Sequence, residues 1–165
     1  ARRRAQGAPF AYAVGRAASR HLTLDVDERV LIPRQETEVL VDEVLARLGG
    51  RAGGTCVDVG TGSGCLALAL ACEGRFARVI GTDVSLDALA VARANARHAE
   101  RALCAPVEFR HGSVLAPVRG CVPPVVARCV VSNPPYIAYA EAEALPAGVR
   151  DWEPPLALYA PQQGM

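Results

Sequence analysis

The sequence predicts an α/β fold in which helices cover both faces of a parallel sheet. Three observations carry this prediction. Short apolar segments alternate with segments of helical periodicity from about residue 36 onward. The four expected strands are nearly continuous apolar runs, as is typical of parallel strands buried on both faces. A glycine-rich turn follows the first of these strands and opens the next helix.

The composition agrees with one folded domain and limits the classes of function. The chain has 165 residues, of which 51% are hydrophobic and 21% are charged. That length suffices for one domain with a sizeable core. The formal net charge is +1, which gives no reason to expect binding to nucleic acid or to a membrane surface. All 18 basic residues are arginine, which excludes a P-loop lysine and a Schiff-base lysine.

The cysteines and the apolar segments indicate a cytoplasmic protein. The six cysteines form no C-x-x-C pair and the three histidines form no spaced cluster, so we expect free thiols and no metal site. The longest apolar run, Cys65 to Cys72, is far shorter than the ~20 residues needed to cross a bilayer. We therefore expect no membrane association.

The first third of the chain is expected to hold a β-hairpin and a helix. Residues 1–20 are expected to be the tail of an N-terminal helical region, and residues 21–165 the main domain. Residues 21–32 alternate between apolar and polar side chains, which predicts a hairpin with its turn near Asp25 to Glu28. An apolar stripe at helical spacing predicts a helix from about Glu36 to Leu48.

Two βα units and two further strands are expected after residue 54. Ser85 is the expected N-cap of the second helix, because its hydroxyl can accept a hydrogen bond from a free backbone N–H of the first turn. The expected strands are Thr55–Val59, Arg78–Gly81, Val107–Arg110 and Val125–Val131, and the expected helices are Cys65–Cys72 and about 86–98.

The turn from Asp58 to Gly64 is the first candidate for a ligand site. Glycines there permit close approach of a ligand to the backbone, and the helix N-terminus offers free N–H groups. The spacing is G-x-G-x-G and not the G-x-G-x-x-G of dinucleotide sites, which favours S-adenosylmethionine over NAD. The alternative is a tight strand-to-helix connection without a ligand. The expected cofactor contacts in this turn are Asp58, Gly60, Thr61, Gly62, Ser63 and Gly64.

Asp83 is the second candidate, because it stands at the end of the second expected strand. An acidic residue at that place can accept hydrogen bonds from both ribose hydroxyls of a nucleoside cofactor. The alternative is that its carboxylate serves only as a partner of Ser85 at the start of the next helix.

The third candidate is the segment Asn133-Pro134-Pro135-Tyr136, at the carboxyl end of the fourth expected strand. The Asn133 side-chain oxygen and the Pro134 carbonyl are two acceptors side by side, which suits an –NH2 group on a planar system. Holding both hydrogens turns the nitrogen lone pair toward an electrophilic methyl group. Tyr136 can stack on the flat group. The alternative is a proline-rich turn with an Asx cap.

The segments together resemble the HemK-like release factor glutamine methyltransferases. Val30 to Glu38 resembles their VLIPRPETE segment, and Asp58 to Leu70 resembles their DLGTGSGCIALAL segment. Val131 to Ile137 is similar to their VSNPPYI, and Trp152 to Leu158 is similar to their EPxLAL. The resemblance runs from about Pro9 to the last residue.

The resemblance implies a class I S-adenosylmethionine-dependent methyltransferase with a Rossmann-like parallel sheet and an N-terminal β-hairpin. The domain from 21 to 165 would then stop after its fourth strand and be incomplete at its C-terminus. The implied reaction transfers a methyl group from S-adenosylmethionine to the side-chain amide nitrogen of the glutamine in the Gly-Gly-Gln motif of peptide chain release factors, which would be the protein partners.

Roles for single residues follow from the same resemblance. The glycine-rich turn would hold the methionine part of the cofactor, and Asp83 its ribose. Val114, where the family commonly has tryptophan, would offer an apolar contact to the adenine. The catalytic residues would be Asn133, Pro134 and Tyr136. Together with Pro135 they would bind the substrate amide, and Asn133 would also touch the cofactor.

Two other functions stay open at this point. An N6-adenine methyltransferase of RNA or DNA acts on a similar planar nitrogen, but it needs a base-flipping surface and usually a basic groove. A non-catalytic fragment of a methyltransferase is the other alternative, because Gly112-Ser113-Val114 replaces the usual Asp-Trp pair of the family.

Overall fold

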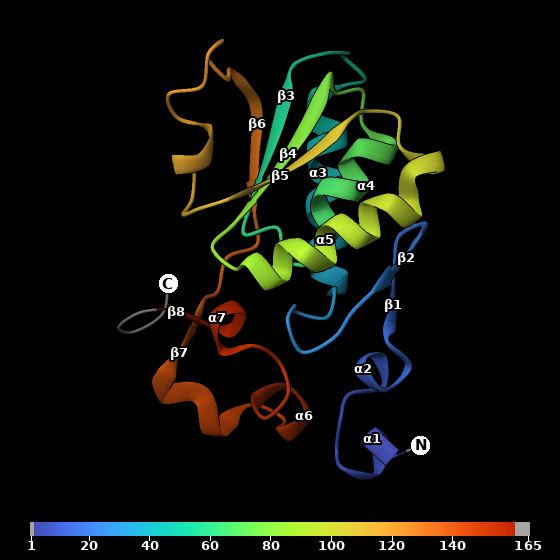
Figure 1. Ribbon diagram of the computed structural model, residues 1–165, viewed down its shortest axis with the longest axis vertical. Coiled ribbons are helices and arrows are strands. Elements are labelled where there is room, and N and C mark those ends of the chain that lie inside the picture. The colour runs from blue at the N-terminus through green and yellow to red at the C-terminus, as the bar shows by residue number, and fades with distance from the viewer. Residues whose placement is uncertain (1, 161–165) are drawn as a thin grey trace.

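The computed structural model describes residues 2–160 and contains a four-stranded parallel sheet in the order β5-β4-β3-β6 (Figure 1). All three neighbouring pairs of strands run parallel. The predicted strands are confirmed, although β6 begins at Ala127 and not at Val125. The strands are β3 (Thr55–Val59), β4 (Arg78–Asp83), β5 (Val107–His111) and β6 (Ala127–Ser132).

Three helices pack side by side against this sheet, with α4 between α3 and α5 (Figure 1). The connections β3–α4–β4 and β4–α5–β5 step across the sheet in the same direction, and right-handed crossovers put both helices on one face. Within residues 2–160, the three long helices therefore lie side by side on this one face of the sheet. The helices are α3 (Gln35–Leu48), α4 (Cys65–Glu73) and α5 (Leu86–Ala99), which confirms the three predicted helices.

The buried position of α4 follows from its composition. Every residue from Leu66 to Ala71 is buried, so α4 is apolar all round and lies in the centre of the packing. Its side chains join Val41 of α3, and Cys56 and Val79 of the sheet, in the main hydrophobic core. All six cysteines are free thiols, of which Cys56 is buried and Cys104 is exposed. Within residues 2–160, no helix is both long and apolar enough to cross a membrane.

The β-hairpin is present, but its predicted position is wrong. β1 (Arg16–Ser19) pairs antiparallel with β2 (Leu22–Asp25), so the turn lies at residues 20–21. The alternation in residues 26–32 has another cause. Val26 and Val30 are buried in a loop, against Tyr12 of the N-terminal region, and form no strand pair.

The predicted domain boundary at residue 20 falls inside the turn of this hairpin. Arg20 there has a positive φ of 50°. Its guanidinium donates to both carboxylate oxygens of Glu73 on α4 at 2.7 Å, and it pairs with Asp42 on α3. The boundary stays a prediction, and the end of the predicted domain, residues 161–165, lies outside the described residues.

The remaining described elements are short. β7 and β8 form a parallel pair that brings residues 137–138 beside residues 159–160. The β5–β6 connection, which holds η2, lies beyond β6 from the three long helices in Figure 1. The short elements are α1 (Arg2–Ala5), α2 (Phe10–Val14), η1 (Glu100–Ala102), η2 (Ala116–Val118), β7 (Ile137–Ala138), η3 (Tyr139–Ala144), α6 (Ala147–Arg150), α7 (Pro155–Leu158) and β8 (Tyr159–Ala160).

Candidate active site

A cavity of about 300 Å³ lies where the four parallel strands end. Its wall combines the turn after β3 with the segments after β4, β5 and β6, together with residues 29–33 and 154–157. Open α/β sheets bind ligands at this edge, because the strand ends and helix N-termini leave polar backbone groups there. Of the predicted site residues, the cavity is lined by Gly60, Thr61, Gly62, Ser63, Asp83, Val114, Asn133, Pro134 and Pro135.

Three predicted site residues are not part of this wall. Asp58 is fully buried, and Tyr136 is 60% exposed. Gly64 lies behind the turn, where a Cβ atom would come within 3.3 Å of Ala92 and Phe109. The glycine at this position therefore permits close packing of α4 on its neighbours. Its φ is +84°, a backbone conformation that residues with a side chain rarely adopt.

Asp58 holds the glycine-rich turn from behind. Its Oδ2 accepts a hydrogen bond from the Thr61 hydroxyl at 2.6 Å and from the Ala67 backbone N–H at 3.2 Å. No described residue donates to its Oδ1. Burial raises the pKa of Asp58 to about 6, against the lowering effect of the two hydrogen bonds.

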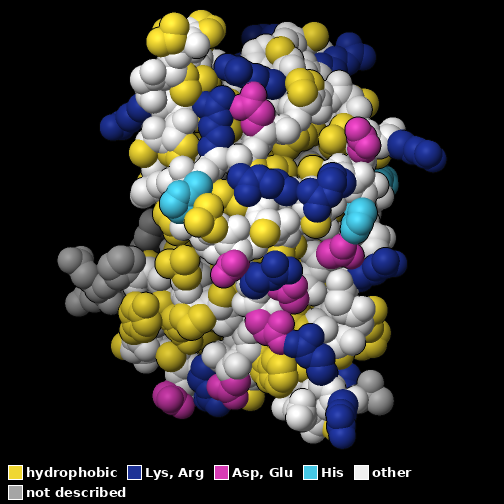
Figure 2. Space-filling view, viewed as in Figure 1, with side chains coloured by type: hydrophobic (Ala, Val, Ile, Leu, Met, Phe, Trp, Pro, Cys, Tyr) yellow, Lys and Arg dark blue, Asp and Glu magenta, His cyan; other side chains and the backbone are white. Residues whose placement is uncertain are grey.

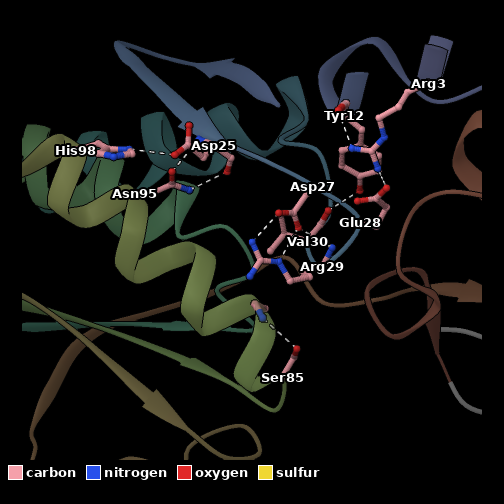
Figure 3. A network of polar contacts seen from close by, with 11 residues as sticks. Arg3, Tyr12, Asp25, Asp27, Glu28, Arg29, Val30, Ser85, Asn95 and His98 are labelled. Carbon is pink, nitrogen blue, oxygen red and sulfur yellow. Dashed lines mark hydrogen bonds and ion pairs between the residues drawn. The ribbon is translucent and has the colours of Figure 1, made fainter. Parts of the chain in front are cut away.

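Asp83 joins two segments of the cavity wall, the glycine-rich turn and the start of α5. Its Oδ2 accepts from the Gly62 N–H and its Oδ1 from the Ser85 N–H, each at 2.9 Å. Ser85 in turn caps α5, because its Oγ accepts from the Ala88 N–H at 3.1 Å (Figure 3). A carboxylate has about four acceptor positions, so two of them remain for ribose hydroxyls. The alternative role beside Ser85 and the cofactor role are thus compatible.

Val114 lines the cavity in an unusual backbone conformation. Its φ is +50°, in the left-handed region that β-branched residues rarely adopt. Its carbonyl accepts from the Thr82 hydroxyl at 2.9 Å, which holds this conformation in place. The Val114 side chain is 60% exposed, so it offers an apolar surface at the cavity edge.

The segment from Asn133 to Tyr136 follows β6 directly. The Ser132 hydroxyl donates to the Val59 carbonyl at 2.8 Å and so fixes the end of β6 beside the glycine-rich turn. The Asn133 side chain donates from Nδ2 to Oγ1 of Thr37 on α3 at 3.2 Å. This contact leaves Oδ1 as the amide atom of Asn133 available to accept a hydrogen bond.

The structure adds three polar anchors that the sequence analysis missed, and the first two involve Asn95 and Tyr12. Asn95 on α5 is 1% exposed. Its Oδ1 accepts from the Asp25 backbone N–H and its Nδ2 donates to the Asp25 carbonyl (Figure 3). Nδ2 also donates to the Ser63 carbonyl at 2.9 Å. The buried Tyr12 hydroxyl donates to the Val30 carbonyl at 2.6 Å (Figure 3). The signal for Asn95 was its place on the apolar face of a helix, where an amide must find partners.

A third missed anchor joins two walls of the cavity. The Glu153 side chain is 1% exposed and accepts from the Arg34 guanidinium at 2.5 Å. Its other oxygen accepts from the Ile32 backbone N–H at 3.2 Å. The contacts hold the loop that carries Leu31 and Pro33 against the segment that carries Pro154.

A family model and two curated relatives that match this chain are all methyltransferases. The model of the methyltransferase small domain family matches residues 35–146. A release factor glutamine methyltransferase of Moorella thermoacetica is 45% identical over 163 residues, which are 99% of this chain and 55% of that protein. Its counterpart in Chlorobaculum tepidum is 43% identical over 168 residues, covering 97% of this chain and 55% of that protein. The resemblance seen in the sequence is confirmed, and the chain spans about half the length of these relatives.

Solved structures agree on the fold. The hMettl16 catalytic domain in complex with the MAT2A 3′UTR hairpin 6 is 18% identical, with a TM-score of 0.61 over 85% of this chain and 51% of that chain. The human methyltransferase 10 domain containing protein is 17% identical, with a TM-score of 0.53 over 75% of this chain and 60% of that chain. The predicted methyltransferase fold is therefore confirmed.

Proposed function

Because this chain belongs to the methyltransferase small domain family, we propose that it serves to methylate the side-chain amide nitrogen of a glutamine in peptide chain release factors, with S-adenosylmethionine as the methyl donor. The glutamine would be that of the Gly-Gly-Gln motif. The observation that carries the proposal is the shared cavity: Asn133 and Pro134 line the same space as the glycine-rich turn and Asp83.

The chemistry of the cavity wall supports this cofactor. Asp83 would accept hydrogen bonds from the ribose hydroxyls, and the backbone N–H groups at the start of α4 would face the methionine part. Val84 and Val114 offer apolar surface for the adenine. When bound, the cofactor supplies an electrophilic methyl group on a positively charged sulfur.

The substrate nitrogen needs help, because the lone pair of an amide nitrogen is delocalised. Asn133 Oδ1 and the Pro134 carbonyl would each accept one N–H of the glutamine amide. This pairing aims the lone pair at the methyl group and stabilises the positive charge that develops on nitrogen. The nitrogen can lose its proton to water afterward, so the reaction needs no general base from the protein.

The surface beside the cavity supports a protein substrate. Tyr136, Tyr139 and Leu156 are each about 60% exposed, and Tyr139 stacks on Tyr159 at a ring distance of 4.8 Å. Figure 2 shows hydrophobic side chains gathered at the lower left, over β7, η3 and α7. Exposed aromatic groups are common in protein interfaces. On the same face, arginines and acidic side chains are interspersed (Figure 2). Free thiols agree with action in the reducing cytoplasm.

A labelling experiment tests the proposal. Full-length protein is incubated with methyl-labelled S-adenosylmethionine and a release factor, beside a release factor in which alanine replaces the glutamine of Gly-Gly-Gln. We expect label on the natural release factor alone. We also expect Asn133→Ala to lower the rate at least about 100-fold, because one of two groups that stabilise the transition state is lost.

Three outcomes would contradict the proposal. Equal label on both release factors would exclude the glutamine as acceptor. Label that nuclease removes would instead support an adenine methyltransferase of RNA or DNA. Calorimetry without any heat of S-adenosylmethionine binding would support a non-catalytic fragment.

A further inference from the structure

We propose that Thr37 is a positioning residue that holds the Asn133 side-chain amide at the cavity wall, with Nδ2 toward α3 and Oδ1 left for the substrate. The proposal rests on the proposed function in one respect, namely that Asn133 accepts a hydrogen bond from a substrate N–H. Thr37 lies in the segment Pro33 to Glu38, and the reaction as described above assigns no role to this residue.

Thr37 lies in a rigid place. It stands in the first turn of α3, and its backbone N–H donates to the Arg34 carbonyl at 3.1 Å. The residue is 5% exposed, and it lines the cavity beside Asn133. Threonine in a helix divides between two χ1 rotamers, and its burial together with the contact to Asn133 holds the hydroxyl in the observed one. Residues 37 and 133 are 96 positions apart, and the tertiary fold alone brings them together.

The contact between the two side chains occupies the NH2 end of the Asn133 amide. Asn133 Nδ2 donates to Thr37 Oγ1 at 3.2 Å. The two ends of an asparagine amide have nearly the same shape, but one end only accepts and the other only donates. If the Asn133 amide turned over, its NH2 group would face the NH2 group of the substrate, and two donors would meet. A threonine hydroxyl can accept or donate, so the Thr37 contact fixes the place of the Asn133 amide, and the substrate N–H groups, which only donate, favour the observed orientation with Oδ1 toward the substrate.

The test compares Thr37→Val with Thr37→Ser in the full-length protein. Valine keeps the shape and removes the hydroxyl, whereas serine keeps the hydroxyl. The first readout is the ¹⁵N–¹H NMR signal pair of the Asn133 side-chain amide, assigned by its loss in Asn133→Ala. We expect this pair to shift in Thr37→Val and to stay close to its natural position in Thr37→Ser.

The second readout is kinetic. We expect Thr37→Val to lower kcat/KM for the release factor about fivefold, which is the effect of losing one neutral hydrogen bond. The Kd for S-adenosylmethionine should change less than about twofold, and Thr37→Ser should restore most of the rate. A matched control is Thr55→Val, which removes a buried hydroxyl that accepts from Arg78 at 3.0 Å away from the cavity. It should alter neither the Asn133 signals nor kcat/KM.

The NMR result decides the inference independently of methylation. Unchanged Asn133 signals in Thr37→Val would overturn it, even if release factors are methylated. A shift of those signals without methylation of any release factor would support the contact and reject the proposed function. An equal loss of S-adenosylmethionine affinity and rate in Thr37→Val and Thr37→Ser would show a merely structural role and overturn the inference.

Discussion

Replacing Asp58 by asparagine tests whether a buried, incompletely paired carboxylate stands behind the glycine-rich turn. Asp58 is fully buried, and burial raises its pKa to about 6. Unfolded, the carboxyl has a pKa of about 4. Between these values the folded protein binds the proton more tightly than the unfolded chain, so the free energy of unfolding falls as the pH rises. The difference amounts to about 3 kcal/mol above pH 6.

Asp58→Asn removes this titration and keeps an oxygen that can accept from Thr61 and Ala67. The new amide N–H groups have no described partner at the former Oδ1, which costs about 1–3 kcal/mol at every pH. That cost cancels when two pH values are compared. The measured quantity is the free energy of unfolding of the variant minus that of the natural protein. We expect this difference to be about 3 kcal/mol larger at pH 7.5 than at pH 4.

The assay is urea unfolding at both pH values, followed by circular dichroism under reversible conditions. Asp87→Asn is the control, because Asp87 is exposed in the first turn of α5. The control removes one carboxylate from an exposed site, so it separates the effect of burial from the effect of the change in charge. If Asp58→Asn changes the free energy of unfolding equally at pH 4 and pH 7.5, Asp58 titrates normally in the folded protein and the reasoning is refuted.

Two further predictions concern packing around the cavity. A Cβ at Gly81 would lie 2.7 Å from the Phe109 ring and 2.8 Å from the Thr61 hydroxyl, so Gly81→Ala should lower the free energy of unfolding by about 1–3 kcal/mol in urea titrations. Glu153→Gln removes the charge that faces Arg34 inside the fold, and thermal unfolding should show a loss of about 1–3 kcal/mol.

Each of these predictions has a contrary result, and the first also has a matched control. For Gly81→Ala the control is Gly148→Ala, because a Cβ at Gly148 meets no atom closer than 3.9 Å. Equal stability of the two variants would show that Gly81 is not tightly packed. For Glu153→Gln, an unchanged unfolding temperature would show that the ion pair between the cavity walls adds no net stability.

The parallel sheet could be predicted because its signals are local. Each strand is a short apolar run, and the turn at residues 60–64 supplies glycines where φ is positive at Gly60, Gly62 and Gly64. Ser85 also behaves as predicted, since a cap depends on a hydroxyl and an N–H three residues apart. Local structure that depends on residues close in sequence can therefore be predicted from the sequence alone.

The hairpin was misplaced because its alternation has a tertiary origin. Val26 and Val30 are buried against Tyr12, and the Tyr12 hydroxyl holds the Val30 carbonyl. A period of two in the sequence is typical of a strand, but in residues 26–32 only Val26 and Val30, four positions apart, are buried, because this loop is packed on one side. The sequence does not distinguish a strand from such a loop, because the side chains that cover the loop come from other segments: Tyr12 lies 18 residues before Val30, and Ala88 and Val91 lie on α5.

The sequence by itself determined which chemical groups this protein brings to its cavity: the glycine-rich turn, Asp83 and the segment from Asn133. Only the tertiary structure decided how they are held. Thr37 meets Asn133 across 96 positions, and Arg34 meets Glu153 across 119. The physical reason is that motif spacing records short-range geometry, whereas the direction of a side chain is set by contacts between distant segments of the chain.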